Sequence, residues 1–475
     1  MMDYLYNTFT SFFFVYSLLL FLSYVFIAVV STLDLSFHLK KSKYFRFNTI
    51  KEYKVIPSIS IIAPAYNEEA SIIENIRSLL SLEYPKLEVI IVNDGSKDNS
   101  LQKVIDHYKL VKVDYAFCNT IDTAKVRGIY KSTEFAYSNL IFVDKENGGK
   151  ADALNVGINI SRSDLFLATD VDCIIEQDAI LRMVKPFLEE DKKRVIATGG
   201  VIRIANSCTI KDGRVVKVNY PNNLWAKFQV LEYFRAFTLG RMAWSRINGL
   251  LIISGAFGLF DRKLTLEVGG YDRTTVGEDF ELVVRLRKYM HNVLKQKYKV
   301  AFIPYPLCWT EVPSKFKTLK NQRNRWTRGS IDTIIKHKDM LLNPKYGKIG
   351  MISFPYWVVF EWLAPIIETV GIIYFIIILI FANINVNIFL ILTLFVFSFA
   401  VFFSSFAVFL ETLVFNKYKG HKFLFTVVLI SIAEIIIYHP LNVYFSLLGN
   451  YTFFIKKDTK GWGKMTRTAF DKTNK

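Results

Sequence analysis

The sequence predicts a mixed α/β domain with a mainly parallel sheet, joined to an α-helical transmembrane region with one N-terminal helix and several C-terminal helices. Three observations predict this class. β-rich runs alternate with helical patterns between residues 55 and 335. Charge-free apolar segments of membrane length occur on both sides of that region. The chain is also 52% hydrophobic, and its mean hydropathy is positive, which is unusual for a soluble protein.

The first element is an apolar segment near the N-terminus. Residues 9–30 include no charged side chain and would measure about 33 Å as a helix, enough to cross a bilayer. The segment lacks the basic start and small-residue cleavage site of a signal peptide. Residues 1–50 are therefore predicted to be a transmembrane anchor with a basic juxtamembrane segment. Four basic residues after the apolar stretch predict that the chain then enters the cytoplasm: Lys40, Lys41, Lys43 and Arg46.

Residues 51–312 are predicted to form a cytoplasmic domain around the parallel sheet. Strands are expected at 59–63, 87–92, 140–143 and 165–168, and helices at 69–80, 100–108 and 150–160. In sheets of this kind, ligands bind beyond the carboxyl ends of the strands. Asp94 and Asp170 each lie just beyond a predicted strand, so both are expected at one rim of the sheet.

Asp170-Val171-Asp172 has the spacing of a site for a divalent cation. Two carboxylates supply hard oxygen ligands, and phosphate oxygens can complete the coordination. The alternative is a turn in which an aspartate caps the next helix. The position at a strand end favours the cation site.

Gly148-Gly149-Lys150 superficially resembles a phosphate-binding loop. Ala151 stands where that motif requires Ser or Thr, and its first glycine is missing, so a nucleotide triphosphatase is rejected. The glycines still allow the backbone to approach a ligand, with Lys150 beside a diphosphate.

Glu278 and Asp279 precede an amphipathic helical pattern at 280–287. They are either an acidic N-terminal cap or a general base held at a helix start, and the two interpretations are compatible. The loop at 254–258 is rich in small residues, so it can graze a substrate through Gly255 and Phe257. A plain turn at a strand end explains the same loop equally well.

Residues 313–348 are predicted to form amphipathic helices at the membrane surface. Six of the fourteen residues from Lys315 to Arg328 are basic, and apolar side chains recur at helical spacing. Within this segment, Trp326 stands close in sequence to Gln322 and to the guanidinium groups of Arg323 and Arg325. Such a group of side chains can stack on a sugar and neutralise a leaving diphosphate, although a basic interfacial helix without a catalytic role is the simpler reading.

Residues 349–455 are predicted to be a second transmembrane region, followed by a basic cytoplasmic tail at 456–475. Pro440 interrupts the last apolar run, which favours two short passes or a re-entrant hairpin. Carboxylates in apolar segments face protein or water. Glu361, Glu368, Glu411 and Glu434 therefore lie at interface ends or helix contacts, or else Glu361 or Glu368 lines a polar conduit. The net charge of +18 is assigned to contact with anionic lipid headgroups, so no nucleic-acid partner is expected. The four cysteines show no disulfide or zinc spacing.

Taken together, the motifs resemble those of membrane-embedded family-2 glycosyltransferases, which include cellulose, chitin, hyaluronan and poly-N-acetylglucosamine synthases. The resemblance covers residues 57–330 and the flanking membrane architecture. It rests on seven elements in order: Ala-Pro-Ala-Tyr-Asn-Glu at 63–68, Asn-Asp-Gly-Ser at 93–96, Gly-Lys-Ala-Asp-Ala-Leu-Asn at 149–155, Asp-Val-Asp at 170–172, the loop at 254–258, Glu-Asp at 278–279 and Gln-x-x-Arg-Trp at 322–326.

The resemblance implies a GT-A-type nucleotide-sugar fold and an inverting transfer from a UDP-sugar donor. It implies that Asp94 binds the uridine end, in a pocket lined by Tyr66 and Glu68. It also places Lys150 and Asp170 near the diphosphate.

The resemblance further implies that Asp172, with Asp170, holds Mg²⁺ or Mn²⁺. Asp279, beside Glu278, would deprotonate the acceptor hydroxyl, and Arg325 would stabilise the leaving diphosphate. The remaining implied roles are acceptor binding by Gln322 and Trp326 and a gating loop with Lys460 and Trp462, whose surroundings match the family only in part.

The leading interpretation is a processive enzyme in the plasma membrane, with several crossings and its catalytic domain in the cytoplasm. It would polymerise UDP-N-acetylglucosamine or UDP-glucose into a linear β-linked polysaccharide, with the growing chain as acceptor, and extrude it through the bilayer. Export or accessory subunits are compatible with this scheme. The alternatives are a membrane enzyme that adds single sugars to a lipid or glycan, and a transporter or scaffold with a nucleotide-binding domain. Product size distinguishes the polymerising enzyme from the first alternative, which adds one sugar per acceptor. The second alternative predicts that no UDP is released from any sugar donor.

Overall fold

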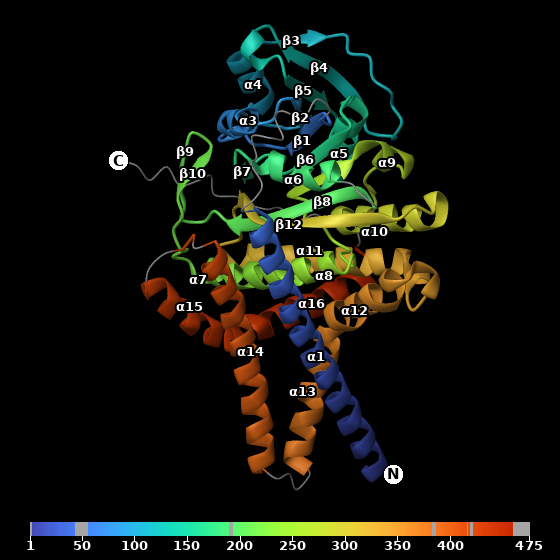
Figure 1. The fold of residues 1–475 in the computed structure, drawn as a ribbon, viewed down its shortest axis with the longest axis vertical. Helices are drawn as coiled ribbons and strands as arrows, with labels where there is room; N and C mark the ends of the chain where they lie inside the picture. Colours follow the sequence, from blue (N-terminus) through green and yellow to red (C-terminus); the bar gives the residue numbers. More distant parts are fainter. Residues whose placement is uncertain are drawn as a thin grey trace.

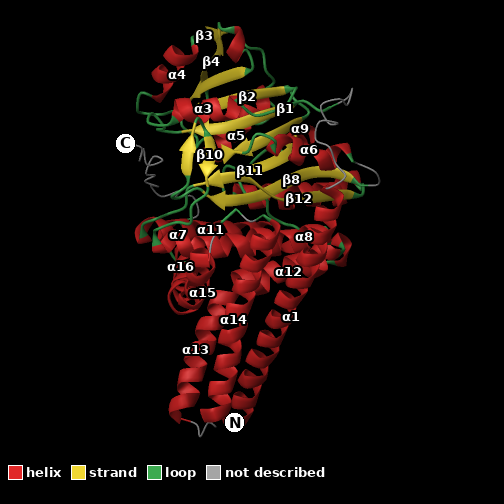
Figure 2. Cartoon of the chain, turned by 60° about the vertical axis from the view of Figure 1, so that its left-hand side comes forward, coloured by secondary structure: helices red, strands yellow, loops and turns green. Residues whose placement is uncertain are grey.

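The computed structural model describes residues 2–42, 56–189, 193–381, 386–415, 417–418 and 421–458. These form three layers, visible in Figure 1 and, after rotation, in Figure 2. An α/β domain lies at one end, a layer of helices lies beneath it, and a bundle of long helices extends away from that layer. The N-terminus lies at the far end of the bundle.

One ten-stranded mixed sheet forms the centre of the α/β domain. Its strands are β1 (Ile59–Ala65), β2 (Leu87–Asp94), β3 (Leu110–Val113), β4 (Val126–Ser132), β5 (Leu140–Lys145), β6 (Leu165–Thr169), β7 (Ile174–Ile175), β8 (Arg194–Ile204), β11 (Phe257–Asp261) and β12 (Tyr298–Thr310). The order across the sheet is β3-β4-β5-β2-β1-β6-β11-β8-β12-β7. A separate hairpin pairs β9 (Thr209–Lys211) with β10 (Arg214–Lys217).

The four strands β5, β2, β1 and β6 run parallel, which confirms the predicted core of the sheet. Ala63 of β1 pairs with Ile91 of β2, and Ile62 pairs with Ala168 of β6. The carboxyl ends of these strands therefore share one rim. Asp94 is the last residue of β2, and Asp170 directly follows β6, as the sequence predicts.

Helices flank the sheet close to their predicted positions. They are α3 (Ile72–Leu80), α4 (Ser100–Tyr108), α5 (Lys150–Ile160), α6 (Ala179–Leu188), α9 (Arg262–Glu267) and α10 (Glu278–Tyr289), with short turns η1 (Phe135–Tyr137) and η3 (Met290–Leu294). Helix α5 is almost entirely buried and packs against β1 and β2. Its buried polar side chains have partners: Asn155 donates to the carbonyl of Tyr271, and Asn159 donates to that of Ile121. Helix α3 starts three residues later than predicted, because the backbone of Glu68 first closes a turn with Ser71 and Ile72.

The strands β11, β8, β12 and β7 on the other side of the sheet were not predicted. Strand β11 runs antiparallel to both of its neighbours, whereas β12 runs parallel to β8 and antiparallel to β7. Strand β12 contains Pro304 and Pro306. Proline cannot donate a hydrogen bond to a sheet, so its presence in a sequence argues against a strand. The structure accommodates them with register shifts between Ile303 and Cys308. Pairing with the neighbouring strand β8, rather than the local strand propensity of the sequence, makes residues 298–310 a strand.

The middle layer contains helices that run beneath the sheet (Figure 2). It comprises α7 (Leu224–Tyr233), the π-helical η2 (Phe234–Arg241), α8 (Met242–Arg246), α11 (Phe316–Lys336), η4 (Lys338–Met340), η5 (Pro344–Tyr346), η6 (Ile349–Ser353), α12 (Phe354–Tyr356) and η7 (Trp357–Trp362). Residues 224–246 belong to the span predicted as the cytoplasmic domain, 51–312. They nevertheless pack on the membrane helices α1 and α14, introduced next.

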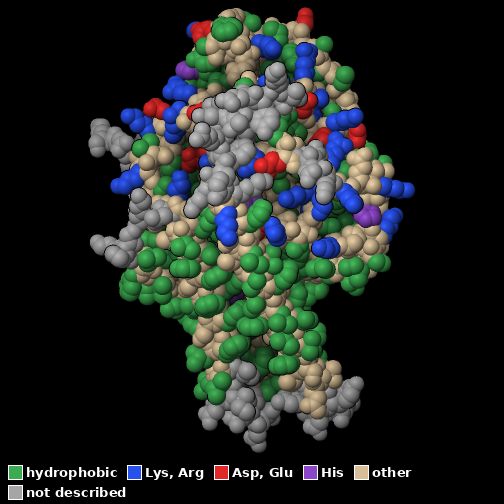
Figure 3. Space-filling view, viewed as in Figure 1, with side chains coloured by type: hydrophobic (Ala, Val, Ile, Leu, Met, Phe, Trp, Pro, Cys, Tyr) green, Lys and Arg blue, Asp and Glu red, His purple; other side chains and the backbone are tan. Residues whose placement is uncertain are grey.

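The bundle consists of α1 (Met2–Ser42), α13 (Ala364–Phe381) and α14 (Val386–Val414). Three helical stretches of the described residues are long and apolar enough to cross a membrane, at 7–40, 393–414 and 423–454. A fourth candidate, 349–362 with 364–380, is bent by 48°. In Figure 3, hydrophobic side chains cover the bundle, whereas Lys and Arg gather on the α/β domain and along its border with the bundle.

The last apolar segment differs from the predicted pair of passes. It forms α15 (His421–Ala433), the π-helical η8 (Glu434–Tyr438) and α16 (His439–Phe454), one helical run in which Pro440 occupies the first turn of α16. Proline is tolerated there because that turn needs no N–H donor from it. Figures 1 and 2 show α16 lying across the bundle beneath α11, against which it packs.

Acidic residues of the apolar segments have partners in the protein. Glu411 accepts hydrogen bonds from the buried Arg203, and Glu434 pairs with Arg235 at 2.6 Å. Glu368 lies 2.9 Å from His439. The first two pairs link β8 and η2 to α14 and η8, in line with the rule that buried charges are paired, whereas the third joins α13 to α16.

Candidate active site

A single cavity of about 630 Å³ lies where the rim of the sheet meets the middle layer. Nine of the predicted site residues line it: Lys150, Asp170, Asp172, Gly255, Glu278, Asp279, Gln322, Arg325 and Trp326. Glu361, Trp362, Asn442 and Ser446 line it from η7 and α16. The cavity is therefore shared between the α/β domain and the membrane region.

Lys150 begins α5 and reaches across the rim. Its Nζ lies 2.5 Å from Oδ1 of Asp170 and donates to the carbonyl of Gly255 at 3.1 Å. Burial opposes the charge on Lys150, but Asp170 and Glu278 outweigh burial and raise the pKa of the lysine. A permanently charged ammonium at this point suits a diphosphate.

Asp279 lies in the first turn of α10, and backbone groups hold its carboxylate. Oδ2 accepts from the N–H of Gly255 at 2.8 Å, and Oδ1 accepts from the N–H of Phe280 at 2.8 Å. These bonds and the helix N-terminus stabilise the anion in one orientation. A fixed carboxylate facing a cavity has the geometry required of a general base.

Glu278, beside it, is 3% exposed. Burial, followed by the charge of Asp279, raises the pKa of Glu278 to about 7, although Lys150 and Arg325 act in the opposite direction. The group is thus mostly neutral at pH 6 and mostly ionised at pH 8. Its ionisation adds a negative charge to the wall of the cavity.

This titration predicts a pH-dependent affinity for an anionic donor. The apparent KM for the donor should rise severalfold between pH 6 and pH 8, because ionised Glu278 repels phosphate groups. In Glu278→Gln the same residue stays neutral, so KM should stay low and nearly constant over that range. Initial rates of UDP release at each pH measure this. A variant whose KM still rises with pH as in the wild type would contradict the assignment.

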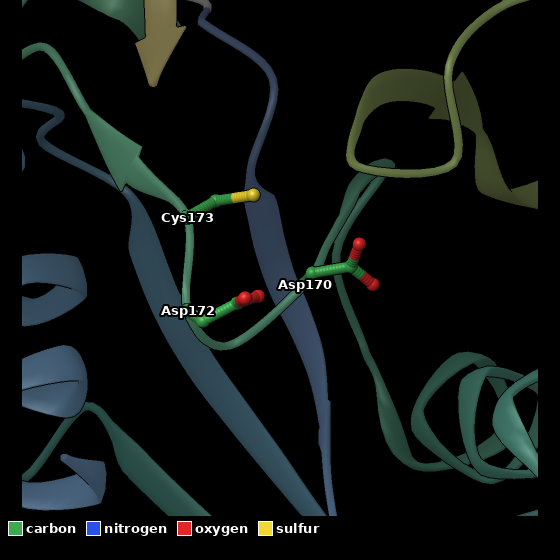
Figure 4. Close-up of side chains that lie close together, drawn as sticks. All are labelled: Asp170, Asp172 and Cys173. Carbon is green, nitrogen blue, oxygen red and sulfur yellow. The ribbon is translucent and has the colours of Figure 1, made fainter. Parts of the chain in front are cut away.

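The loop between β6 and β7 offers a ligand set for a cation (Figure 4). Ligand atoms of Asp170, Asp172 and Cys173 all lie within 4.8 Å of one another. Two carboxylates suit Mg²⁺ or Mn²⁺, which prefer oxygen ligands, and phosphate oxygens can fill the other positions. The residues present therefore fit the expected divalent cation.

Asp94 lies at the same rim but is not part of the cavity wall. Its carboxylate accepts bonds from Lys145 Nζ at 2.6 Å and from the N–H groups of Gly148 and Gly149 at 2.9 and 2.8 Å. Asp94 thereby holds the loop that presents Lys150. Gly149 has a positive φ of +89°, which glycine adopts without strain. Glycine at this position therefore allows the turn that leads into Lys150.

The other predicted residues of the donor pocket lie further along that rim. Tyr66 follows β1 and is 46% exposed, and Glu68 is half-buried in the next turn. Neither lines the cavity described above. The contacts of Tyr66 and Glu68 with uridine stay a prediction.

Phe257 does not occupy the place expected of an acceptor-binding residue. Its side chain is fully buried in the core, where it packs beside Gly200. Strand β11 turns this side chain into the core, while the loop before it leaves Gly255 at the cavity. Lys460 and Trp462 lie outside the described residues. Asp458, near the end of the described chain, accepts a hydrogen bond from Arg328 of α11 through its carbonyl.

Trp326 is held over the cavity by its own helix. The guanidinium of Arg323 lies 4.2 Å from the centre of the indole ring and donates to Glu232 at 2.7 Å and to the hydroxyl of Tyr438 at 3.0 Å. Tyr438 is buried and donates to Glu232 at 2.8 Å. The indole, 38% exposed, thus presents a ring to the cavity from a platform built by three helical segments.

Two glycines bring the acidic and basic parts of the site together. Gly277 precedes α10, and Gly329 lies on α11 one turn after Arg325. A Cβ on Gly329 would lie 2.7 Å from the Cα of Gly277. The backbones of α10 and α11 therefore touch here, which sets Asp279 close to Arg325.

Gly329→Ala is expected to lower both thermal stability and transferase activity. The new methyl group must push α11 from α10, and overpacking of this kind costs about 1–3 kcal/mol. Thermal unfolding and UDP release from purified protein in lipid nanodiscs measure the two effects. Asn321→Ala, at an exposed position of the same helix, is the control. If the two variants behaved alike, the close approach would have no role in the site.

Several lining residues were not identified from the sequence. They lie mainly on α7–η2–α8 and η7: Glu232, Tyr233, Phe237, Arg241, Trp244, Trp357 and Trp362. The run Leu-Trp-Ala-Lys-Phe-Gln-Val-Leu-Glu-Tyr-Phe-Arg at 224–235 mixes aromatic and basic residues as an interfacial helix does. That pattern could have revealed a second interfacial element beside α11.

Comparisons with known proteins agree with this geometry. Residues 57–329, more than half of the chain, match the family model described as glycosyltransferase-like family 2. A poly-β-1,6-N-acetyl-D-glucosamine synthase of Staphylococcus epidermidis is 29% identical over 372 residues, which cover 78% of this chain and 76% of that protein. A protein of the same name from Staphylococcus aureus strain COL is 27% identical over 317 residues, or 66% of this chain and 65% of that protein.

A solved structure shows the same fold. The mannosyltransferase PcManGT of Pyrobaculum calidifontis, determined with GDP-Man and Mn²⁺, aligns with a TM-score of 0.50 at 16% identity. The alignment covers 82% of this chain and 100% of that one. The GT-A-like mixed sheet is thus shared with an experimentally known enzyme. By the match of its α/β domain, this chain belongs to glycosyltransferase-like family 2 and is a family-2 glycosyltransferase.

Proposed function

We propose that the protein polymerises N-acetylglucosamine from UDP-N-acetylglucosamine into a linear β-linked polysaccharide and passes the product through the membrane. The observation that carries this proposal is the shared cavity. Asp172, Asp279 and Trp326 line one space together with Glu361 and Asn442 of the membrane region. The names of the relatives support N-acetylglucosamine and a β-1,6 linkage.

The transfer step uses residues already held in place. A hydroxyl oxygen of the acceptor attacks the anomeric carbon of the donor sugar, and Asp279 takes the hydroxyl proton. The bond between that carbon and the phosphate oxygen breaks, and UDP leaves with the bonding electron pair. Attack from the side opposite UDP inverts the anomeric configuration. Lys150 and Arg325 offset the negative charge that gathers on UDP.

Asp170 and Asp172 would hold Mg²⁺ or Mn²⁺ in this reaction. A bound divalent cation supplies electrostatic stabilisation of the departing diphosphate. Lys150 contacts Asp170 directly, so the ammonium and the metal-binding carboxylate are positioned as one unit. Asp94 secures the loop on which Lys150 stands. Through that loop, Asp94 supports the diphosphate side of the site.

The acceptor end of the cavity suits a polymer that moves after each transfer. Trp326 offers a flat apolar surface, and stacking on such a surface tolerates a sliding sugar better than directional hydrogen bonds. Gln322 Oε1 is buried at this wall and has no hydrogen-bond partner among the described residues. It is placed to accept a bond from a sugar hydroxyl.

The membrane arrangement is proposed from charge and length. Residues 1–50 would form a transmembrane anchor and a basic juxtamembrane segment, and 349–455 would be embedded. Residues 51–312 and 456–475 would face the cytoplasm, and 313–348 would lie at the interface. The basic border above the apolar bundle supports this orientation (Figure 3). The enzyme would be a multi-pass protein of the plasma membrane, to which accessory subunits could add export functions.

The test is a reconstitution with each donor in turn. Purified protein in lipid vesicles receives UDP-N-acetylglucosamine or UDP-glucose with Mg²⁺ or Mn²⁺, and UDP release and product size are measured. Long products that β-1,6-specific hydrolases degrade are expected with the first donor. One added sugar per acceptor would establish the non-processive alternative. UDP release from UDP-glucose alone would reassign the donor.

A further inference from the structure

Arg241 is a cation on the cavity wall that forms no ion pair with any of the residues that the structure describes. It ends the π-helical segment η2, and its side chain lines the cavity. Its Nη1 is buried without a hydrogen-bond partner, and no ion pair joins it to any residue in the described parts of the chain. Burial is its dominant influence and lowers the pKa of Arg241 to about 10, so the group stays charged at neutral pH.

Other buried or half-buried arginines of the described residues have an acidic partner or backbone acceptors, although Nη2 of Arg287 and Nε of Arg323 also lack a hydrogen bond. Arg203 pairs with Glu411, Arg235 with Glu434 and Arg323 with Glu232. Arg287 donates to the carbonyls of Leu250 and Asn248. Arg241 as a whole is half-buried, but its Nη1 is buried. Because a buried polar group without a partner is costly, a guanidinium with no ion pair beside a cavity indicates a ligand that supplies its missing acceptors.

The guanidinium is also held rigidly. Its centre lies 3.9 Å from the ring centre of Phe237, one turn earlier in η2. Phe237 is 3% exposed and belongs to the core of the α/β domain. Stacking restrains the plane of the guanidinium and leaves its in-plane N–H groups to bond a ligand. A π-helical turn at this point is typical of functional sites.

The surroundings of Arg241 suit the acceptor sugar better than the diphosphate of the donor. Segment η2 packs on α1 and α14, on the membrane side of the cavity, and Trp244 lines the wall one turn further on. Lys150 contacts Asp170 of the candidate metal loop at 2.5 Å, whereas no ion pair joins Arg241 to that loop among the described residues. Arg241 therefore adds a cation to the cavity wall apart from the pair of Lys150 and Asp170.

We propose that Arg241 binds the terminal sugar of the acceptor and orients its attacking hydroxyl toward Asp279. The inference rests on the proposed glycosyl transfer. Sugar hydroxyl and acetamido oxygens are neutral acceptors that satisfy a guanidinium through charge-assisted hydrogen bonds. None of the seven motifs on which the family resemblance rests includes Arg241.

The test separates use of the acceptor from use of the donor. Arg241→Gln is assayed with UDP-N-acetylglucosamine and short N-acetylglucosamine oligosaccharides as acceptors. Transfer to the oligosaccharide should fall about 10- to 100-fold in kcat/KM, mainly through the acceptor KM, as expected for loss of a charge-assisted bond. Calorimetric affinity for UDP with Mn²⁺, and slow hydrolysis of the donor without acceptor, should stay within about twofold of wild type.

Arg246→Gln is the matched control. Arg246 follows on α8, its side chain is 48% exposed, and it contacts only Asp34 and Phe37 of α1 among the described residues. It does not line the cavity, so all three measurements should match wild type. If Arg241→Gln does not fold, Arg241→Lys decides the matter, with a smaller rise in acceptor KM expected.

Two results would overturn the proposal. Weaker UDP binding with an unchanged acceptor KM would assign Arg241 to the diphosphate. Unchanged kinetics in both Arg241 variants would show that Arg241 does not bind the acceptor. A wild-type protein that releases no UDP from any UDP-sugar would instead refute the proposed function itself, so the two failures are distinguishable.

Discussion

Asp279→Asn is expected to lower the rate of sugar transfer by about 10²- to 10⁴-fold, the usual contribution of a general base. The amide cannot take the proton of the acceptor hydroxyl, yet it has nearly the same shape. Its oxygen can still accept one of the two backbone bonds that hold the carboxylate, from Gly255 and Phe280. The loss should therefore appear in kcat, with UDP affinity and thermal stability close to wild type.

The matched control for this variant is Asp261→Asn. Asp261 also stands at a helix start, where it accepts a backbone bond from Leu264 and pairs with Arg194, but it lies outside the cavity. Its substitution should lower stability slightly and leave kcat unchanged. If Asp279→Asn retained more than about a tenth of the wild-type kcat, Asp279 could not be the base.

Asp172→Asn is expected to have the second-largest effect. Losing one carboxylate weakens the site for a divalent cation and removes electrostatic stabilisation of the leaving UDP, a loss of about 10²- to 10³-fold in kcat/KM. The affinity for Mn²⁺, measured by calorimetry in the presence of UDP, should fall. Raising the Mn²⁺ concentration should restore part of the activity, and a chelator should abolish it in wild type.

Asp178→Asn controls for charge removal close to this loop. Asp178 precedes α6 and pairs with Arg182 at 2.7 Å, away from the cavity. Mn²⁺ affinity and turnover should match wild type. If Asp172→Asn bound Mn²⁺ as tightly as wild type while activity fell, the carboxylate would act otherwise than as a metal ligand.

Local patterns were sufficient for the parts of the site that lie at strand ends or helix starts. Asp170 follows an apolar strand, and the register of β1 with β6 confirms its place at the rim. Helix α5 begins at Lys150 as predicted. The mainly parallel sheet, the family and the apolar helices were likewise predicted from periodicity and motif order. Each of these signals resides in a few consecutive residues.

Other features depended on contacts between distant segments. Phe257 and Gly255 stand two residues apart, yet the pairing of β11 with β6 buries one and leaves the other at the cavity. For Asp94, contact with the uridine end stays a prediction, and the fold adds bonds that the sequence does not show, from Lys145, Gly148 and Gly149 to its carboxylate. No local pattern encodes which partner a polar group will meet after folding.

The sequence by itself determined the chemistry available to this protein: an acidic pair at a strand end, acids at a helix start, a basic helix with Trp326 and apolar segments of membrane length. Only the tertiary structure decided how these meet. The contact of Gly277 with Gly329, the platform beneath Trp326 and the place of Arg241 on the cavity wall arise where elements far apart in the chain pack together. The physical reason is that periodicity sets the faces of one element, whereas distances between elements follow from how all of them fill the interior.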